Sequence, residues 1–163
     1  MIPFRPAVAA PRLPEGYTLL QEPEGARPRD CGNDDLDEQL NRLLLDSGDQ
    51  PRSPDRWRAT LERSAWHLRV CDPQGRIVGF VRATSDQALN ANLWDLLSDP
   101  ADPCRQEVIT ALVRAALGRL RRELGGCSIS LSAPPEALEA LVQVGFVVDP
   151  GGIRAMGLAL PRS

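Results

Sequence analysis

The chain has 163 residues, of which 42% are apolar, with a formal net charge of −3 and an isoelectric point near 5.2. This length and apolar content fit one compact domain and leave little room for a second. Acidic and basic residues are mixed along the sequence, so no basic face is available for nucleic acid.

Neither a metal site nor a membrane segment is expected. The four cysteines stand singly, without the CxxC or CxxxC spacing of a zinc site. No run reaches the roughly 18 apolar residues of a membrane span. Residues 1–14 lack the basic start and apolar core of a signal peptide. We therefore expect a cytoplasmic protein with reduced thiols.

The N-terminal third predicts an arm, one strand and two helices. Prolines at positions 3, 6 and 11 disfavour packed structure, so residues 1–13 are expected to form a flexible arm before a single domain over 14–163. Residues 15–21 read as a short strand. A first helix has Asn33 or Asp34 as its cap, leucines at helical spacing and Gly48 at its end, and Ser53-Pro54 starts a second helix.

The middle of the chain predicts three antiparallel strands, over residues 66–70, 76–84 and 92–97. The first two are separated by Asp72-Pro73-Gln74-Gly75, which has the composition of a tight turn. Hairpin connection of neighbouring strands is the economical arrangement.

The C-terminal third predicts a long helix, a parallel strand and a short terminal unit. An apolar stripe runs from Cys104 to Leu124, and Gly125-Gly126 closes that helix. A strand over 127–132 follows, and because a helix connects it to the strand before, the two should run parallel and diverge at their ends. A short helix over 134–142 and strands over 146–148 and 155–160 complete the pattern.

This order of elements resembles the GNAT acetyltransferase superfamily, and within it the plastid and cyanobacterial N-acetyltransferases that include plant serotonin N-acetyltransferase. The local blocks that carry the resemblance are Gly79–Asp86, Asn90–Asp95, Val144–Phe146 and Asp149–Met156. The fold class implied is α/β (α+β), with a mixed, mostly antiparallel sheet of about seven strands and about four helices.

The resemblance implies acetyl-CoA as cofactor. Pantetheine would lie where two central strands diverge, and the diphosphate on amides at the start of the long helix, where unpaired N–H groups attract anions. The corresponding positions here are Leu96, Leu97, Ser98, Arg105, Gln106, Glu107, Val108 and Ile109.

The family's glycine-rich pattern is absent from those positions. Arg105, Glu107 and Ile109 fall where the family has small residues, and Asp102-Pro103 is itself a helix-cap signal that would use the amides a phosphate needs. The acetyl-CoA site is thus predicted to be degenerate. The alternative is that Arg105 supplies a phosphate contact and that a bent loop still admits the cofactor.

Candidate catalytic groups are few. Many family members carry on the last helix a tyrosine that protonates the departing CoA thiolate, and this chain has Leu141 or Val142 there. Asp95 is the best candidate base, with the rival interpretation that it meets solvent or an arginine. His67, the only histidine, is expected to be structural.

These features favour a catalytically weak or inactive module that binds or regulates a protein partner. One alternative is a working acetyl-CoA-dependent N-acetyltransferase that acts on an amine, a protein lysine or an N-terminus. A scaffold or assembly subunit is the other.

Overall fold

The computed structural model describes residues 12–22 and 36–152. The strands are β1 (Thr18–Glu22), β2 (Trp66–Cys71), β3 (Ile77–Ser85), β4 (Asn90–Ser98) and β5 (Ser128–Leu131). The α-helices are α1 (Leu36–Asp46), α2 (Pro54–Glu62), α3 (Arg105–Glu123) and α4 (Leu138–Gln143), and two short 3₁₀ turns lie at Pro135–Ala137 and Pro150–Gly152.

The strands form one sheet in the order β1-β2-β3-β4-β5. The first four pair antiparallel, and β4 pairs parallel with β5 across the α3 crossover, as the sequence predicts. The β4–β5 pairing joins Asn90–Leu93 to Ser128–Leu131 and then stops, whereas β4 continues along β3 as far as Ser98. The two strands therefore separate from Trp94 onward.

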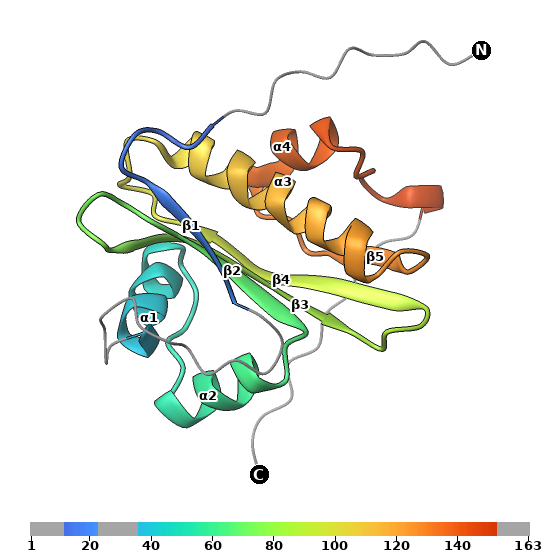
Figure 1. Ribbon diagram of the computed structural model, residues 1–163, viewed down its shortest axis with the longest axis horizontal. Helices are drawn as coiled ribbons and strands as arrows, with labels where there is room; N and C mark the ends of the chain where they lie inside the picture. The colour runs from blue at the N-terminus through green and yellow to red at the C-terminus, as the bar shows by residue number, and fades with distance from the viewer. Residues whose placement is uncertain (1–11, 23–35, 153–163) are drawn as a thin grey trace.

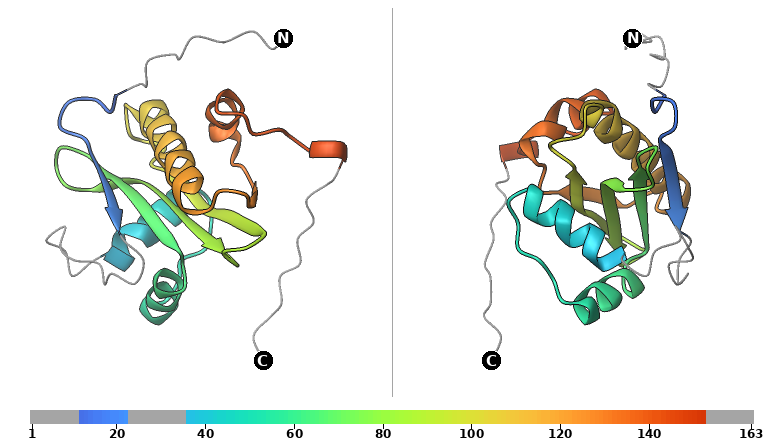
Figure 2. Two further views of the ribbon diagram at one scale, coloured as in Figure 1. Left: turned by 45° about the vertical axis from the view of Figure 1, so that its right-hand side comes forward. Right: turned by 90° about the vertical axis from the view of Figure 1, so that its left-hand side faces the viewer.

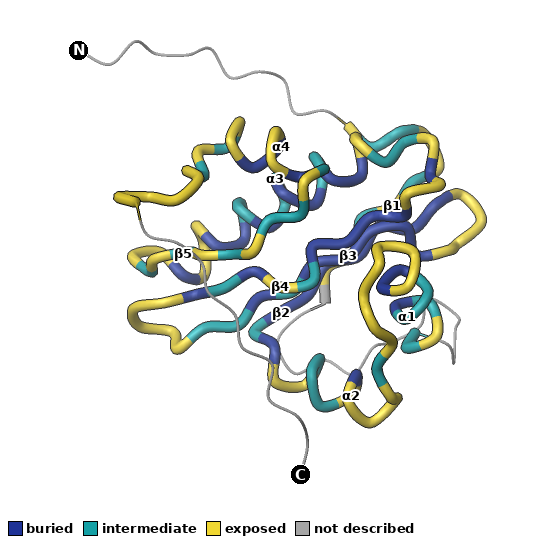
Figure 3. The backbone as a smooth tube through the Cα atoms, turned by 180° about the vertical axis from the view of Figure 1, so that it is seen from behind, coloured by how far each residue is buried: buried dark blue, intermediate teal, exposed yellow. Residues whose placement is uncertain are grey.

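Helices cover both faces of the sheet (Figures 1 and 2). Helices α1 and α2 lie on one face over a core of Leu40, Leu43, Leu44, Trp57, Phe80 and Leu97. Helices α3 and α4 lie on the other, over a larger core that includes Val81, Leu93, Leu112 and Leu141. The central strands are the most deeply buried part of the described chain (Figure 3).

Gly79 sets the approach of α3 to the sheet. A Cβ at this position would lie 2.5 Å from Cγ1 of Val108 and 2.9 Å from Cδ1 of Leu112. Both contacts are shorter than real Cβ atoms make, so only glycine lets the first turns of α3 pack this closely on β3. The start of α3, where the candidate site lies, is fixed by this contact.

Several predicted helix boundaries can be checked. Ser53 caps α2, with its Oγ accepting a hydrogen bond from the Arg56 amide at 3.4 Å, and Gly48 follows α1 with a φ of 81°. The cap predicted at Asn33 or Asp34 and most of the predicted arm lie outside the described residues. Within the described ranges, no helix combines the length and hydropathy of a bilayer-spanning segment.

The prediction of about seven strands differs from the five found in the described residues. Phe146–Val148 was predicted as a strand but is irregular, with Val147 and Val148 exposed. Valine favours strands only where a neighbouring strand offers pairing and packing. The strand predicted at 155–160 lies outside the described residues.

Candidate functional site

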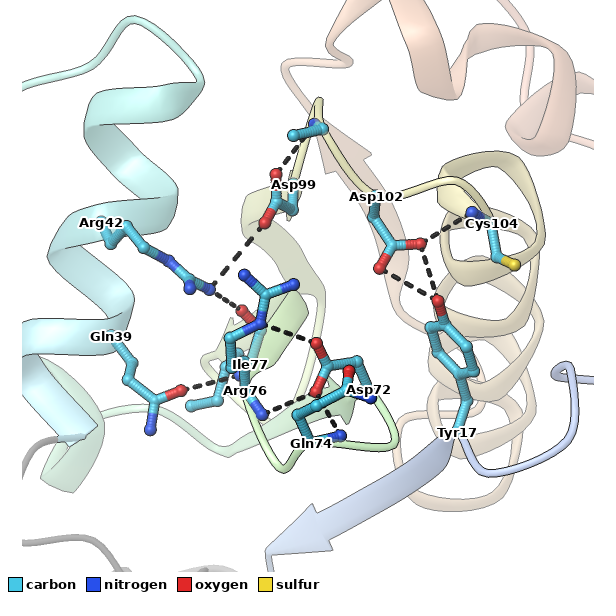
Figure 4. Close-up of polar contacts among 11 residues, drawn as sticks. Tyr17, Gln39, Arg42, Asp72, Gln74, Arg76, Ile77, Asp99, Asp102 and Cys104 are labelled. Atoms are coloured by element: carbon cyan, nitrogen blue, oxygen red, sulfur yellow. Dashed lines mark hydrogen bonds and ion pairs between the residues drawn. The ribbon is translucent and has the colours of Figure 1, made fainter.

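The start of α3 is held by Asp102 and Tyr17. Oδ1 of Asp102 accepts a hydrogen bond from the Cys104 amide at 2.8 Å, and the Tyr17 hydroxyl donates to the two carboxylate oxygens at 3.2 and 3.1 Å (Figure 4). The pKa of Tyr17 is raised, first by burial and then by hydrogen bonds with Cys104 and Asp102, so its hydroxyl stays protonated as a donor.

The predicted side-chain cap at Asp102 is not formed, because α3 begins at Arg105 with Cys104 as its N-cap and has no side-chain cap. Asp102 instead binds the Cys104 amide just ahead of the helix. The Arg105 amide donates to the backbone oxygen of Asp102 at 3.2 Å rather than to the carboxylate, since the turn places that carbonyl beneath it. The carboxylate and this carbonyl therefore take up two amides in advance of the helix. Gln106 and Glu107 carry the remaining first-turn amides, which have no acceptor within a helix.

Arg105 is engaged by neighbouring side chains. Its Nε donates to Ser98 Oγ at 2.9 Å, and its Nη2 donates to Glu136 Oε1 at 2.5 Å. This contact joins the first residue of α3 to the 3₁₀ turn before α4. The guanidinium that could contact a phosphate is thus paired with a carboxylate, and Glu107 adds a second carboxylate, exposed, on the same first turn.

Five of the eight predicted cofactor positions have buried side chains: Leu96, Leu97, Ser98, Val108 and Ile109, each at most 9% exposed. The side chains of Val108 and Ile109 belong to the α3 core, so none of these five positions offers an exposed side chain to a ligand. Arg105, Gln106 and Glu107 are the three whose side chains reach the surface.

Asp95 lies at an irregularity of β4. The β3–β4 register shifts between Phe80 and Arg82, and Asp95 has a φ of 52°, in the left-handed region. Its carboxylate accepts hydrogen bonds from Arg52 at 3.0 and 2.6 Å and from Arg82 at 2.5 Å. Of the two interpretations of Asp95, a base or a partner of arginine, these contacts favour the partner of arginine.

These arginines decide the proton affinity of Asp95. Burial alone would raise its pKa, but hydrogen bonds and charges from Arg52 and Arg82 outweigh burial and leave the pKa below its ordinary value. A carboxylate held in this way is a poor proton acceptor. Sequence reasoning missed both arginines. The single local signal is Arg82, the one charged residue within β3.

The position of the family's general acid lies beside a cavity of about 630 Å³ between β4, β5 and α4. Leu141 is 2% exposed and Val142 is 55% exposed, and both line this cavity together with Leu93, Trp94 and Ile129. The chain's single tyrosine, Tyr17, is bonded to Asp102 at the start of α3. No acidic group replaces the missing phenol at positions 141 and 142.

His67, for which a structural role is predicted, is buried. It is 4% exposed within β2, and its Nδ1 has no hydrogen-bond partner among the described residues. Burial first, and then the positive charges of Arg69 and Arg119, lower its pKa to about 4. The imidazole is consequently neutral at physiological pH. Among the described residues, no group of three His, Cys, Asp or Glu side chains is arranged to hold a metal.

Comparison with known proteins gives a consistent family. GCN5-related N-acetyltransferase 1, chloroplastic, from Arabidopsis thaliana is 32% identical over 157 residues, covering 91% of this chain and 76% of that protein. Probable acetyltransferase TAP2 from Glycine max is 31% identical over 161 residues, covering 88% of this chain. No family model matches the sequence.

The chain spans only part of some relatives: 63% of the length of TAP2 and 35% of the length of Histone acetyltransferase TAP1 from Glycine max. Among solved structures, SA2161 from Staphylococcus aureus, described as a probable acetyltransferase, superimposes with a TM-score of 0.69 at 13% identity. The match covers 88% of this chain and all of that one. At this identity, the likeness concerns the fold alone.

Proposed function

Since the chain belongs to the GCN5-related N-acetyltransferase family, we propose that its acetyl-CoA site is degenerate and that it acts as a catalytically weak or inactive binding and regulatory module. The observation that carries this proposal is the arrangement at the start of α3. Asp102 takes up the Cys104 amide, and Glu136 pairs with Arg105.

A diphosphate at this helix start would meet carboxylates. Glu107 and Glu136 are both partly or fully exposed there, and Asp102 is 7% exposed beneath them. Two like charges at about 4 Å repel by about 4 kcal/mol at the effective dielectric of a protein surface. One guanidinium already shared with Glu136 offsets only part of this repulsion.

Catalysis would also lack its proton donor. Leu141 and Val142 are apolar and cannot protonate a departing thiolate, a role that contributes about 10² to 10⁴ in rate. Asp95, the candidate base, is held ionised by Arg52 and Arg82. Both departures lower turnover independently of whether the cofactor binds.

The partner proposed for the module is a protein. Apolar side chains are exposed around the β4–β5 cavity, including Trp94 at 46%, Val142 at 55% and Val147 at 70%. A gathered apolar rim of this kind favours protein contact, and it fits the scaffold alternative equally. The proposed location is the cytoplasm, although several relatives carry the word chloroplastic in their names.

A working acetyl-CoA-dependent N-acetyltransferase is the second candidate. It is favoured by the separation of β4 from β5 after Leu93 and by the positive φ of Asp95, which leave room and main-chain donors for a thioester. The amine would then attack the thioester directly, with Asp95 or water as proton acceptor and the CoA thiolate as leaving group. Its substrate class would be an amine, a protein lysine or an N-terminus.

Calorimetric titration with acetyl-CoA separates the two candidates. The module predicts no heat of binding at about millimolar cofactor, whereas a Kd near micromolar would support the enzyme. Thioester consumption should be measured in the same samples with polyamine, arylalkylamine and lysine-peptide acceptors. Turnover above background with any of them would overturn the proposal.

A further inference from the structure

A second cavity lies near the start of α3, on the side of β1 and of the turn between β2 and β3 (Figure 4). Its volume is about 890 Å³, and it is open to solvent. Residues of β1, of α1 and of the turn between β2 and β3 line it, among them Thr18, Gln39, Arg42 and Arg76. The volume is that of a small-molecule site.

Two side chains of α1, one an acceptor and one a donor, bind the backbone of Ile77. The Gln39 carbonyl oxygen accepts a hydrogen bond from the Ile77 amide at 2.7 Å, and Arg42 Nη2 donates to the Ile77 carbonyl at 2.6 Å (Figure 4). Each bond fixes one end of its side chain. The amide NH₂ of Gln39 and the other guanidinium N–H groups of Arg42 remain as further donors by their chemistry.

Arg76 extends this group of donors. Its Nε donates to Asp72 Oδ2 at 2.8 Å, and its side chain is 55% exposed. Asp72 also accepts hydrogen bonds from the amides of Gln74 and Arg76, so its carboxylate is committed to the turn. Arginine has five N–H donors, and the bond to Asp72 uses one of them, so other N–H groups of Arg76 can bind a ligand.

Few hydrogen-bond acceptors in this cavity are available to a ligand. Asp72 is 2% exposed as a side chain, and Asp99, 4.0 Å from Arg42 Nη2, already accepts the Ala101 amide. Glu38 is the one acidic residue in the cavity lining that is exposed. Donors on fixed side chains therefore outnumber acceptors that a ligand can reach.

We propose that this cavity binds a small organic oxyanion, a carboxylate or a phosphate, held by Arg42 and Arg76 with Gln39 as a neutral donor. Guanidinium groups recognise both oxyanions through paired N–H donors. The cavity borders the start of α3, because Arg42 lies 4.0 Å from Asp99, and Tyr17, next to the lining residue Gly16, bonds to Asp102. None of the residues proposed to hold acetyl-CoA lines it. Its ligand would contact β1, α1 and the β2–β3 turn together.

The test uses ¹⁵N-labelled full-length protein titrated with citrate and, separately, with inorganic phosphate. We expect the amide signals of Gly16 and Gly75, both in the cavity lining, to shift with saturation at millimolar probe. Arg76→Gln should weaken binding about tenfold, the effect of one charge-assisted hydrogen bond. Asp72 keeps its hydrogen bonds from the amides of residues 74 and 76 in this variant, and the replaced side chain is half exposed. Arg42→Gln should weaken binding similarly where it folds.

Arg58→Gln is the matched control, because Arg58 is 68% exposed on α2 and pairs only with Asp55 in the same helix. It should bind both probes as the wild type does. Citrate bound in preference to phosphate would assign a carboxylate ligand, and the reverse a phosphate. The proposal fails if neither probe shifts Gly16 and Gly75, or if Arg58→Gln weakens binding as much as Arg76→Gln.

Discussion

Arg105 and Glu136 join the first residue of α3 to the turn before α4, with Nη2 and Oε1 2.5 Å apart. The pair is 31% and 26% exposed, so water screens it and its contribution to stability is small. The pair matters for binding, because it occupies the Arg105 guanidinium that a phosphate would need. A phosphate at this helix end would compete with Glu136 for Arg105 and would meet the charge of Glu107.

Removing both carboxylates should improve cofactor binding. The double variant Glu107→Gln/Glu136→Gln leaves Arg105 free of its partner and removes two like charges, so we expect it to give a heat of binding with acetyl-CoA at about millimolar concentration, where the wild type gives none. The measurement is calorimetric titration at low ionic strength, where surface charges act most strongly. Glu139→Gln, exposed in the first turn of α4, controls for the loss of charge alone. Equal heats in the wild type and the double variant would contradict the electrostatic explanation.

Asp102 should stabilise the fold through the start of α3. Asp102→Ala removes the acceptor of the Cys104 amide and of the Tyr17 hydroxyl, with an expected loss of about 0.5–2 kcal/mol in the free energy of unfolding. Tyr17→Phe removes only one of these bonds and should lose about 1 kcal/mol or less. Urea unfolding of the two single variants and the double variant gives the coupling between them. A coupling of zero would show that the Tyr17–Asp102 bond has no energetic weight.

Asp95 should matter for stability rather than for chemistry. Asp95→Asn leaves Arg52 and Arg82 without their charge partner, and breaking a largely buried ion pair of this kind costs about 3 kcal/mol. Asp55→Asn, in an exposed pair on α2, is the control and should change stability by about 0.5 kcal/mol or less. The measurement is chemical denaturation at neutral pH. An Asp95→Asn variant as stable as the control would show that the Arg52–Asp95–Arg82 contacts contribute little.

The same carboxylate predicts a pH dependence. Because the pKa of Asp95 is lowered in the folded state, its stabilising effect is complete above the unfolded value of about 4. The effect is lost as pH falls through the lower folded value. Asp95→Asn should therefore reduce the loss of stability in acid below about pH 4. A wild type and a variant with parallel stability curves in that range would contradict the assignment.

His67 predicts a separate loss of stability at milder pH. Its folded pKa of about 4 lies below the ordinary value of 6.5, so the unfolded chain takes up a proton first as pH falls. The free energy of unfolding should decrease by about 2 kcal/mol between about pH 7 and pH 5. His67→Phe should remove this dependence. As the chain has a single histidine, the comparison isolates this group. An unchanged slope in the variant would show that other groups titrate there.

Local sequence patterns predicted much of the fold but little of the candidate site. The apolar stripe of α3 and the tight turn at residues 72–75 are local signals, and the crossover rule then gives the parallel β4–β5 pair. The same stripe contains Val108 and Ile109, so the helical spacing of apolar residues also predicts that these two side chains are buried. The strand predicted at Phe146–Val148 is wrong because strand propensity needs a pairing partner.

The contacts that define the site are remote in sequence. Arg52 and Asp95 are 43 residues apart, Arg105 and Glu136 are 31 apart, and Tyr17 and Asp102 are 85 apart. Nothing in the local composition marks these partners, because a charged side chain on a surface-facing position looks the same whether it is paired or solvated. Only the assembled sheet brings them together.

The last prediction concerns acetyl transfer itself. The wild type should consume no acetyl-CoA above background, because the phosphate site carries carboxylates and positions 141 and 142 lack a phenol. Rebuilding one feature alone should not restore activity, since cofactor binding and thiolate protonation are separate requirements.

The informative variant combines Arg105→Gly and Glu107→Gly with Leu141→Tyr. It leaves Ile109 in place, because a glycine at this 1% exposed position would open a cavity costing about 2–5 kcal/mol. Where Leu141→Tyr does not fold, Val142→Tyr presents the phenol from an exposed position on the same cavity. Release of the CoA thiol is measured with the polyamine, arylalkylamine and lysine-peptide acceptors. Clear turnover by the unmodified protein, lost in Asp95→Asn while the fold is retained, would establish the enzyme instead of the module.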